Sequence, residues 1–189
     1  MAEFKNVTKK YGDKAVLDNF SLTLHQGSKT LIMGESGCGK TTLLRIAAGL
    51  EKPDDGEFLS NEKIALMFQE HRLLPWKNAL ENVRAVLLKE QKILADKYLS
   101  AVGLENDKNK YPRELSGGMA QRVAFARFLA YAEATDATLL LLDEPFSALD
   151  DETATKMLDL ITDFSKNKTL LMVAHHLPDV PFADNIITL

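Results

Sequence analysis

Apolar and polar positions alternate in two ways along the chain, and each predicts one kind of element. In roughly the first 30 residues, short runs such as 15–17 and 20–24 alternate apolar and polar side chains between glycine-containing turns. This spacing predicts a small antiparallel sheet. Continuous apolar runs predict buried strands further along, at residues 30–33, 64–68, 139–142, 169–174 and 186–189.

Apolar residues spaced three and four apart predict the helices. This spacing occurs in residues 40–50, 76–103, 119–134 and 152–165. The sequence at 53–56, Pro-Asp-Asp-Gly, predicts a turn. Because strands and helices alternate after residue 60, we expect an α/β fold with a mostly parallel, doubly wound sheet flanked by helices.

The composition is that of an ordinary globular chain. The 189 residues are 46% hydrophobic and 26% charged, which is enough for one domain, residues 1–189, with a substantial core. The net charge of −4 gives no electrostatic reason to expect nucleic acid as a partner.

Targeting and redox signals favour the cytoplasm. Cys38 is the only cysteine, so no internal disulfide can form, which suits a reducing compartment. The first five residues lack the apolar core of a signal peptide, and no apolar run approaches the roughly 18–20 residues that span a bilayer. We therefore expect a cytoplasmic protein that reaches a membrane only through a partner.

A glycine-rich loop between a predicted strand and a predicted helix carries the strongest chemical signal. Its sequence, GESGCGKT, matches the phosphate-loop pattern G-x-x-x-x-G-K-[ST], in which backbone N–H groups turn inward around a polyphosphate. Lys40 would reach the β- and γ-phosphates of ATP, and Thr41 would ligate Mg²⁺ at the helix start, where anions are favoured. A chance glycine-rich turn is the alternative, and the full match in this context disfavours it. The candidate nucleotide-binding residues here are Gly34, Glu35, Ser36, Gly37, Cys38, Gly39, Lys40, Thr41 and Thr42.

Two carboxylates follow the predicted strand at 139–142. Asp143 would hold Mg²⁺, directly or through water, and Glu144 fits the general base that orients and deprotonates the attacking water. A carboxylate pair at a strand end can instead be a helix cap or a solvated turn. Four buried leucines before the pair, and the phosphate loop elsewhere in the chain, favour the catalytic interpretation.

A Ser-Gly-Gly turn precedes the predicted helix at 119–134. The hydroxyl of Ser116 and the amides of Gly117 and Gly118 form a second candidate anion site ahead of a helix. The alternative is an ordinary N-cap, because serine is a good capping residue.

In combination and in order, these segments resemble the ATP-binding-cassette (ABC) ATPases, over nearly the whole chain. Residues 121–124 and 126–127, Gln-Arg-Val-Ala and Ala-Arg, also match the pattern of that family. The resemblance implies a P-loop cassette with a small N-terminal antiparallel subdomain and a helical signature subdomain at about 76–134. It implies an ATPase in which Glu144 is catalytic, and an ATP-bound homodimer. Two ATP molecules would lie head to tail, each between one phosphate loop and the partner's signature turn.

The resemblance also implies roles for four further residues. Gln69 would contact Mg²⁺ and the attacking water, although a surface glutamine starting a loop is the simpler interpretation. His175 would contact the γ-phosphate as a catalytic switch residue. Asp150 would cross the dimer interface, cap the following helix, or do both. Tyr11 would stack on adenine, although a tyrosine beside a glycine turn more often only packs.

The loop at 68–76 looks like the segment that docks a transmembrane subunit. Leu73, Leu74 and Trp76 are apolar residues flanked by charge, so they either form an exposed docking patch or pack on the local helix. With Leu-Ser-Gly-Gly-Met at 115–119, this loop is most similar to ATPases of bacterial importers for nitrate, sulfonates and taurine. The implied partners are transmembrane permease subunits and an extracytoplasmic solute-binding protein, with the chain peripheral on the inner face of the cell membrane.

Three features depart from the family pattern. Met119 stands where many members have glutamine, the segment at 56–69 is shorter than usual, and relatives usually continue beyond Leu189. We therefore expect a trimmed antiparallel subdomain and weak dimerisation without the membrane partner.

Other function classes fit the sequence less well. Soluble ABC ATPases of DNA repair or translation carry long coiled-coil insertions or two cassettes, and neither occurs here. A nucleotide-binding regulator would not need Glu144, and a phosphate-loop kinase would not need the turn at 116–118. The sequence predicts the ATP-hydrolysing subunit of an ABC transporter, a bacterial importer of a small solute. A non-transport ABC ATPase or a regulator is the alternative.

Overall fold

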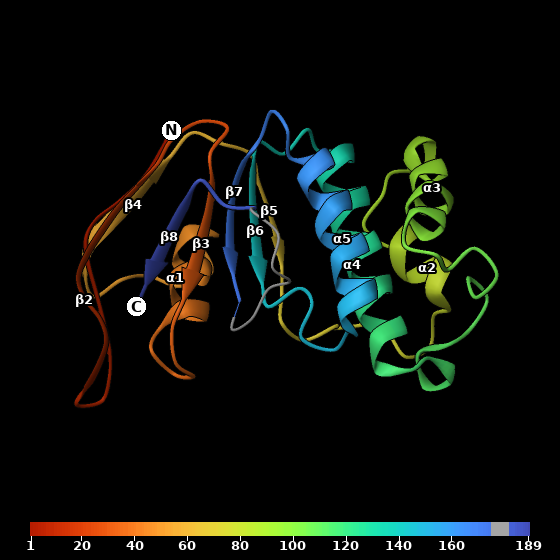
Figure 1. The fold of residues 1–189 in the computed structure, drawn as a ribbon, viewed down its shortest axis with the longest axis horizontal. Helices are drawn as coiled ribbons and strands as arrows, with labels where there is room; N and C mark the ends of the chain where they lie inside the picture. The colour runs from red at the N-terminus through yellow and green to blue at the C-terminus, as the bar shows by residue number, and fades with distance from the viewer. Residues whose placement is uncertain (175–181) are drawn as a thin grey trace.

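Two β-sheets and a group of helices make up the structure, a computed structural model that describes residues 1–174 and 182–189 (Figure 1). The antiparallel sheet has the order β2-β1-β4, and the second sheet has the order β5-β6-β7-β3-β8. The strands are β1 Ala2–Tyr11, β2 Lys14–Leu24, β3 Lys29–Met33, β4 Asp55–Ser60, β5 Ile64–Met67, β6 Leu139–Asp143, β7 Thr169–Val173 and β8 Asn185–Thr188. The α-helices are α1 Lys40–Ala47, α2 Ala79–Arg84, α3 Ile93–Ala101, α4 Gly117–Ala134 and α5 Asp151–Phe164, and the short 3₁₀ turns are Lys89–Gln91 and Pro112–Glu114.

The second sheet is parallel throughout its described strand pairs, which confirms the predicted α/β fold. Every residue of β6 and β7 is buried, as their continuous apolar runs predict. Because parallel strands end at the same edge of a sheet, the segments that follow β3, β5 and β6 meet at one edge.

The antiparallel sheet includes one strand, β4, that the sequence did not predict because its first residues have the composition of a turn. β1 is its central strand, and Phe4 there is fully buried, with ring centroids 4.5 Å from Phe58 and 5.9 Å from Phe20. The predicted turn at 53–56 is wrong at its second half, because β4 begins at Asp55. Pairing with β1 and burial of Phe58 against Phe4 outweigh the low strand preference of Asp-Gly.

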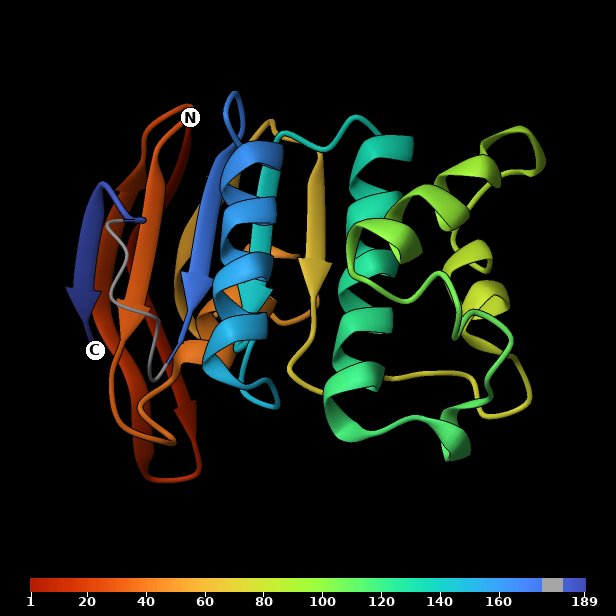
Figure 2. The same cartoon turned by 45° about the vertical axis from the view of Figure 1, so that its right-hand side comes forward.

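The helices form layers around the parallel sheet (Figure 2). The helix α1 packs against β6, α4 packs against β5, and α2 and α3 pack on α4 at its side away from the sheet. The positions of α1, α4 and α5 confirm the predicted helices at 40–50, 119–134 and 152–165 within a few residues. None of the helices in the described part of the chain is long and apolar enough to cross a membrane.

The helical spacing predicted at 76–103 is confirmed, but it does not form one continuous helix. The segment forms α2 and α3, separated by a bend in which Leu88 adopts an extended conformation. Gln91 holds this bend, because its side chain accepts a hydrogen bond from the Leu88 N–H at 3.2 Å and donates one to the Ala134 carbonyl at 2.9 Å. The bend lets both short helices pack on α4.

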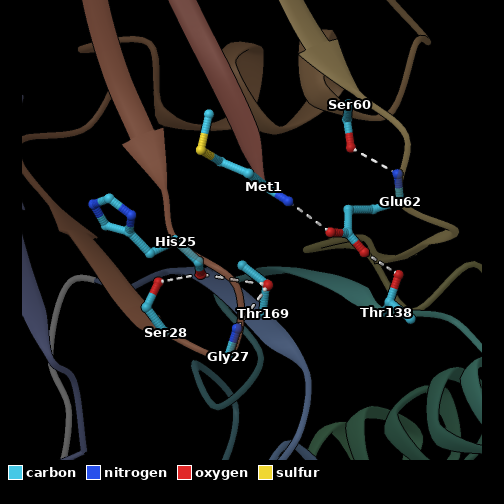
Figure 3. Close-up of polar contacts among 8 residues, drawn as sticks. All are labelled: Met1, His25, Gly27, Ser28, Ser60, Glu62, Thr138 and Thr169. Atoms are coloured by element: carbon cyan, nitrogen blue, oxygen red, sulfur yellow. Dashed lines mark hydrogen bonds and ion pairs between the residues drawn. The ribbon is translucent and has the colours of Figure 1, made fainter.

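Polar contacts at one end of the molecule join the two sheets (Figure 3). The N-terminal ammonium of Met1 lies 2.9 Å from Oε1 of Glu62, and the Thr138 hydroxyl donates to the same carboxylate. The Gly27 N–H donates to Oγ1 of Thr169 at 3.1 Å just before β3. The contacts of Glu62 tie the start of β1 to the segments before β5 and β6, and the contact of Gly27 ties the segment before β3 to β7.

Candidate functional site

The glycine loop connects the end of β3 to the start of α1. Gly39 is the N-cap of α1, with φ of +107°, and a Cβ there would collide with the Val16 carbonyl, so only glycine fits. Within the described part of the chain, no side chain caps this helix N-terminus. Its first N–H groups and its dipole therefore suit an anion such as a phosphate.

Lys40 points back into this loop. Its ammonium donates to the carbonyls of Gly34 and Glu35, each at 2.7 Å, and lies 3.8 Å from Sγ of Cys38. The residue is only 5% exposed. The loop thus surrounds a positive charge at the position where a polyphosphate would be bound.

The two carboxylates lie where β6 ends, beside the loop. Asp143 is 4% exposed, and this burial raises its pKa, while a hydrogen bond from Thr41 acts in the opposite direction. Its Oδ1 is buried with no hydrogen-bond partner among the described residues. A buried carboxylate oxygen next to a threonine hydroxyl fits one side of a Mg²⁺ site, since Mg²⁺ takes one or two carboxylates plus phosphate oxygens.

Glu144 has a backbone conformation that is unusual for its residue type. Its φ is +46°, in the left-handed region, and its N–H donates to the Val173 carbonyl at 2.9 Å. Its Oε2 accepts a hydrogen bond from Nε2 of Gln69 at 3.0 Å. The segment after β5 therefore meets the segment after β6, as expected for neighbouring parallel strands.

These side chains surround one hollow of about 340 Å³. Six of its lining residues come from the candidates in the glycine loop and the start of α1, two come from the antiparallel sheet and two from the segments after β5 and β6. They are Tyr11, Val16, Ser36, Gly37, Gly39, Lys40, Thr41, Thr42, Gln69 and Glu144. The structure thus brings together most of the residues predicted from the sequence to bind a nucleotide. Gly34, Glu35 and Cys38 belong to the same loop but do not line this hollow.

Tyr11 lies at one side of the hollow. Its hydroxyl donates to Glu51 and lies 3.5 Å from Oγ1 of Thr42, while the Lys9 ammonium is 5.7 Å from the ring centroid. The side chain is 47% exposed, so its ring offers a free surface to a flat ligand. The adenine-stacking role stays a prediction.

The Ser-Gly-Gly turn does not line the hollow. Its role as a second anion site therefore stays a prediction. Ser116 is the N-cap of α4, with its Oγ accepting from the Met119 N–H at 3.2 Å, so the capping alternative is confirmed. Ser116 and Gly117 are exposed, and Gly118 approaches the carbonyl of Ala148 closely. The exposed turn is therefore available to a group outside this chain.

Two further predicted residues have different outcomes. Asp150 caps α5, accepting from the Thr153 N–H and the Thr153 hydroxyl, each at 2.9 Å. The backbone N–H of Thr153 is the main reason why the pKa of Asp150 is lowered. Its interface role stays a prediction. His175 lies outside the described residues.

Three side chains make contacts that the sequence did not predict. Gln121 donates to the Pro145 carbonyl at 2.6 Å, and Arg127 donates to the carbonyls of His71 and Arg72 at 2.6 and 2.9 Å. Glu51 pairs with Tyr11. Gln121 and Arg127 were visible only as parts of a family pattern, because nothing local in the sequence tells which carbonyl a side chain reaches.

A second, more apolar hollow of about 470 Å³ lies between β5, the segment just after α2, and α4. Its lining residues include Phe68, Glu70, Arg72, Leu74, Val86, Arg127, Phe128 and Tyr131. The Arg72 guanidinium lies 3.9 Å from the centroid of the Phe68 ring. Of the three predicted docking residues, Leu74 lines this groove, Leu73 packs against the core, and Trp76 is 70% exposed.

Comparisons with known proteins agree with this geometry. Residues 17–147 match the family model described as ABC transporter. The chain is 42% identical over 191 residues to the aliphatic sulfonates import ATP-binding protein SsuB 2 of Paraburkholderia xenovorans, covering 98% of this chain and 75% of that protein. It is 41% identical over 194 residues to the SsuB protein of Yersinia pestis, covering 97% of this chain and 70% of that protein.

Two solved structures have the same fold. Both are dimers of the ATP-binding cassette MJ0796, described as a bacterial ABC transporter cassette, and one is a post-hydrolysis state bound to ADP and Pi. Their TM-scores are 0.87 for the post-hydrolysis state and 0.88 for the other, at 34% identity, with 100% of this chain and 94% of that chain covered in each case. This chain therefore belongs to the ABC transporter family, as an ATPase that binds and hydrolyses ATP.

Proposed function

We propose that this chain powers the import of an aliphatic sulfonate or a closely related small solute, as the ATPase subunit of a bacterial transporter. The observation that carries the ATPase mechanism is the hydrogen bond between Gln69 and Glu144 at the rim of the hollow that Lys40 lines. It joins a carboxylate to an amide that can orient water, and both residues line the same hollow as the phosphate-binding loop. We also propose that the whole chain, residues 1–189, forms a single ATPase domain that includes a helical subdomain at about 76–134.

Binding of ATP would use groups from three segments. The N–H groups of the glycine loop and the start of α1 bind the phosphates, and Lys40 exchanges its carbonyl partners for β- and γ-phosphate oxygens. Tyr11 stacks on the adenine, with Glu51 holding its hydroxyl. The nine residues from Gly34 to Thr42 form the phosphate-binding segment.

A Mg²⁺ ion would be held by the Thr41 hydroxyl, Asp143 and the Gln69 amide oxygen. The orphaned Oδ1 of Asp143 supports this assignment. When bound, the ion neutralises charge on the phosphate oxygens. Among the described residues no group of three or more His, Cys, Asp or Glu could hold a metal by itself, which suits a site completed by phosphates.

Hydrolysis would depend on Glu144 as the general base. Its carboxylate takes a proton from the attacking water, and Gln69, hydrogen-bonded to it, helps to orient that water. His175 would contact the γ-phosphate as the switch residue. Lys40 stabilises the negative charge that develops on the transferring phosphoryl group.

The ATP-bound state would be a head-to-tail homodimer. Ser116, Gly117 and Gly118 do not line their own chain's hollow, and two of the three are exposed. They would complete the partner's nucleotide site, and Asp150 would lie at the same interface. The dimeric assembly of the related cassette MJ0796 supports this arrangement.

A permease subunit would occupy the groove between β5, the segment just after α2, and α4. The groove combines an apolar floor with a charged rim formed by Glu70, Arg72 and Arg127, which suits an amphipathic segment of a membrane protein. Trp76 follows the groove residue Leu74 closely in the chain, and its exposed side chain would add apolar surface for the same partner. We place the chain in the cytoplasm, bound to the membrane through this groove, with an extracytoplasmic protein delivering the solute.

Growth on a defined sulfur source tests the proposed solute. A deletion strain of the source organism should grow on sulfate but not on ethanesulfonate, and a plasmid-borne wild-type copy should restore growth. A Lys40→Ala copy should fail to restore it. Undiminished growth of the deletion strain on ethanesulfonate and other alkanesulfonates would refute the solute assignment.

A further inference from the structure

One face of α4 contacts the turn that follows β6. The residues on this face are Gly118, Gln121 and Phe125, spaced three and four apart as helix geometry requires for a shared face. Gly118 approaches the Ala148 carbonyl, and the ring of Phe125 packs edge-on against Phe146 with centroids 6.0 Å apart. The helix that begins at the Ser-Gly-Gly turn is therefore fitted against the segment that contains Glu144.

Gln121 makes the polar contact of this face. It is 1% exposed, and its Nε2 donates to the Pro145 carbonyl at 2.6 Å and more weakly to the Glu144 carbonyl at 3.4 Å. Its Oε1 is buried without a partner among the described residues. The two hydrogen bonds from Nε2 to the carbonyls therefore hold the side-chain amide in this orientation, at the cost of an unsatisfied Oε1.

The Glu144 backbone needs such support. A left-handed conformation, such as the φ of +46° at Glu144, is strained at a residue other than glycine and persists only where neighbouring contacts fix it. The Val173 carbonyl holds the Glu144 N–H, and the Ser147 hydroxyl donates to the Glu144 carbonyl at 3.2 Å. Pro145 has no N–H to donate, so its carbonyl is the next backbone group of the turn that can form a hydrogen bond.

We propose that Gln121 is a positioning residue for Glu144. By holding the Pro145 and Glu144 carbonyls, it keeps the strained turn in the conformation that directs the carboxylate toward Gln69 and the nucleotide hollow. Gln121 also lies on the helix that Ser116 caps. In the proposed dimer the turn at Ser116 contacts the partner's nucleotide, whereas Glu144 acts on the nucleotide of its own chain. Gln121 therefore links the two nucleotide sites. This inference rests on the proposed role of Glu144.

The proposal predicts a loss of turnover without a loss of ATP binding. Gln121→Met keeps the length of the side chain but removes its N–H donors, and no part of residue 121 lines the hollow. A small displacement of a catalytic group can lower the rate about 100-fold. We expect kcat to fall at least about 10-fold, while the KM for ATP and the Kd of a fluorescent ATP analogue stay within about twofold.

Gln91 provides a matched control. It also donates its side-chain amide to a backbone carbonyl, that of Ala134 at the other end of α4, and it does not line the nucleotide hollow. Gln91→Met should leave kcat within about twofold of wild type. Thermal unfolding of both variants checks that each is folded under the assay conditions.

Residual single-turnover hydrolysis in a Glu144→Gln background provides the decisive comparison. If Gln121 acts through Glu144, adding Gln121→Met to Glu144→Gln should change the residual rate less than twofold. An equal fold-loss in both backgrounds, or a rise in KM that accounts for the whole effect, would overturn the proposal. Full activity of Glu144→Gln alone would instead refute the proposed base, and so separates the two failures.

A second variant decides the matter if Gln121→Met does not fold. Gln121→Glu keeps the size of the side chain, and its carboxyl can donate to the Pro145 carbonyl only when protonated. The ratio of its kcat to that of wild type should therefore rise as the pH is lowered from 8.5 to 6. A ratio that is flat with pH would contradict the positioning role.

Discussion

Nε2 of Gln69 donates a hydrogen bond to Oε2 of Glu144 at 3.0 Å, although the two residues are 75 positions apart in the sequence. The contact arises because β5 and β6 are parallel neighbours, so the segments that follow them leave the sheet at the same edge. It joins the loop that leads to the proposed permease groove with the carboxylate proposed to activate water. A change in that groove therefore has a short structural route to the catalytic base.

Replacing Lys40 by alanine should weaken ATP binding with little effect on folding. Charge-assisted hydrogen bonds contribute about 1.5–3 kcal/mol, so the Kd of a fluorescent ATP analogue should rise roughly 10- to 100-fold. The control is Lys14→Ala, because the Lys14 ammonium also contacts the glycine loop, at 3.5 Å from the Gly37 carbonyl. Equal losses of affinity in the two variants would contradict a specific role for Lys40.

Asp143→Asn should stabilise the protein at neutral pH in the absence of Mg²⁺ and ATP. Burial raises the folded-state pKa of Asp143, so its ionised form opposes folding above that pKa. The gain in unfolding free energy should therefore disappear as the pH falls from the raised pKa to the ordinary aspartate value. Urea unfolding at pH 7.5 and at progressively lower pH measures it.

Asp150→Asn is the control of opposite sign. The Thr153 N–H lowers the pKa of Asp150, so its ionised form stabilises the protein above its ordinary pKa, and that stabilisation is lost as the pH falls through the lowered value. This variant should be less stable than wild type at pH 7.5. Equal shifts of the same sign in the two variants would refute the burial argument for Asp143.

Alkylation of Cys38 should inactivate the ATPase, and ATP should protect it. The thiol is half-buried in the glycine loop, 3.8 Å from the Lys40 ammonium, so an added group would block the phosphates. Mass spectrometry of N-ethylmaleimide labelling, with and without ATP, measures the protection. A Cys38→Ser variant should keep its ATPase activity in N-ethylmaleimide. Equal labelling of Cys38 with and without ATP would contradict the predicted protection.

Val86→Arg should weaken permease binding without changing ATP hydrolysis by the isolated chain. Val86 is 39% exposed and lines the groove, so a charge there opposes an apolar partner. The control is Ile93→Arg, since Ile93 is 75% exposed but does not line the groove. Copurification with the permease subunits measures binding, and equal losses in both variants would argue against this groove as the docking site.

The sequence predicted the parallel sheet and the nucleotide-binding residues because their signals are local. The buried strands are continuous apolar runs, and Gly39 and Lys40 occupy fixed places in an eight-residue pattern. The alternation of strands and helices then predicts that these strands are parallel, but not their order in the sheet. Nothing outside those segments was needed to predict their structure.

What the sequence did not predict depends on contacts between distant segments. The strand β4 forms because Phe58 packs on Phe4, and the bend between α2 and α3 forms because Gln91 reaches Ala134. The partner carbonyl of Gln121 is likewise fixed only once α4 packs on the turn after β6. Hydrophobic periodicity contains no information about such partners.

ATP hydrolysis measured against protein concentration, for wild type and Glu144→Gln, tests the central claim most directly. In the proposed dimer each nucleotide site needs the partner's turn at 116–118, so wild-type activity should rise more than linearly with concentration. The Glu144→Gln variant should lose activity and accumulate as an ATP-bound dimer. A rate that is linear in concentration and unaffected by Glu144→Gln would contradict both the shared site and the proposed base.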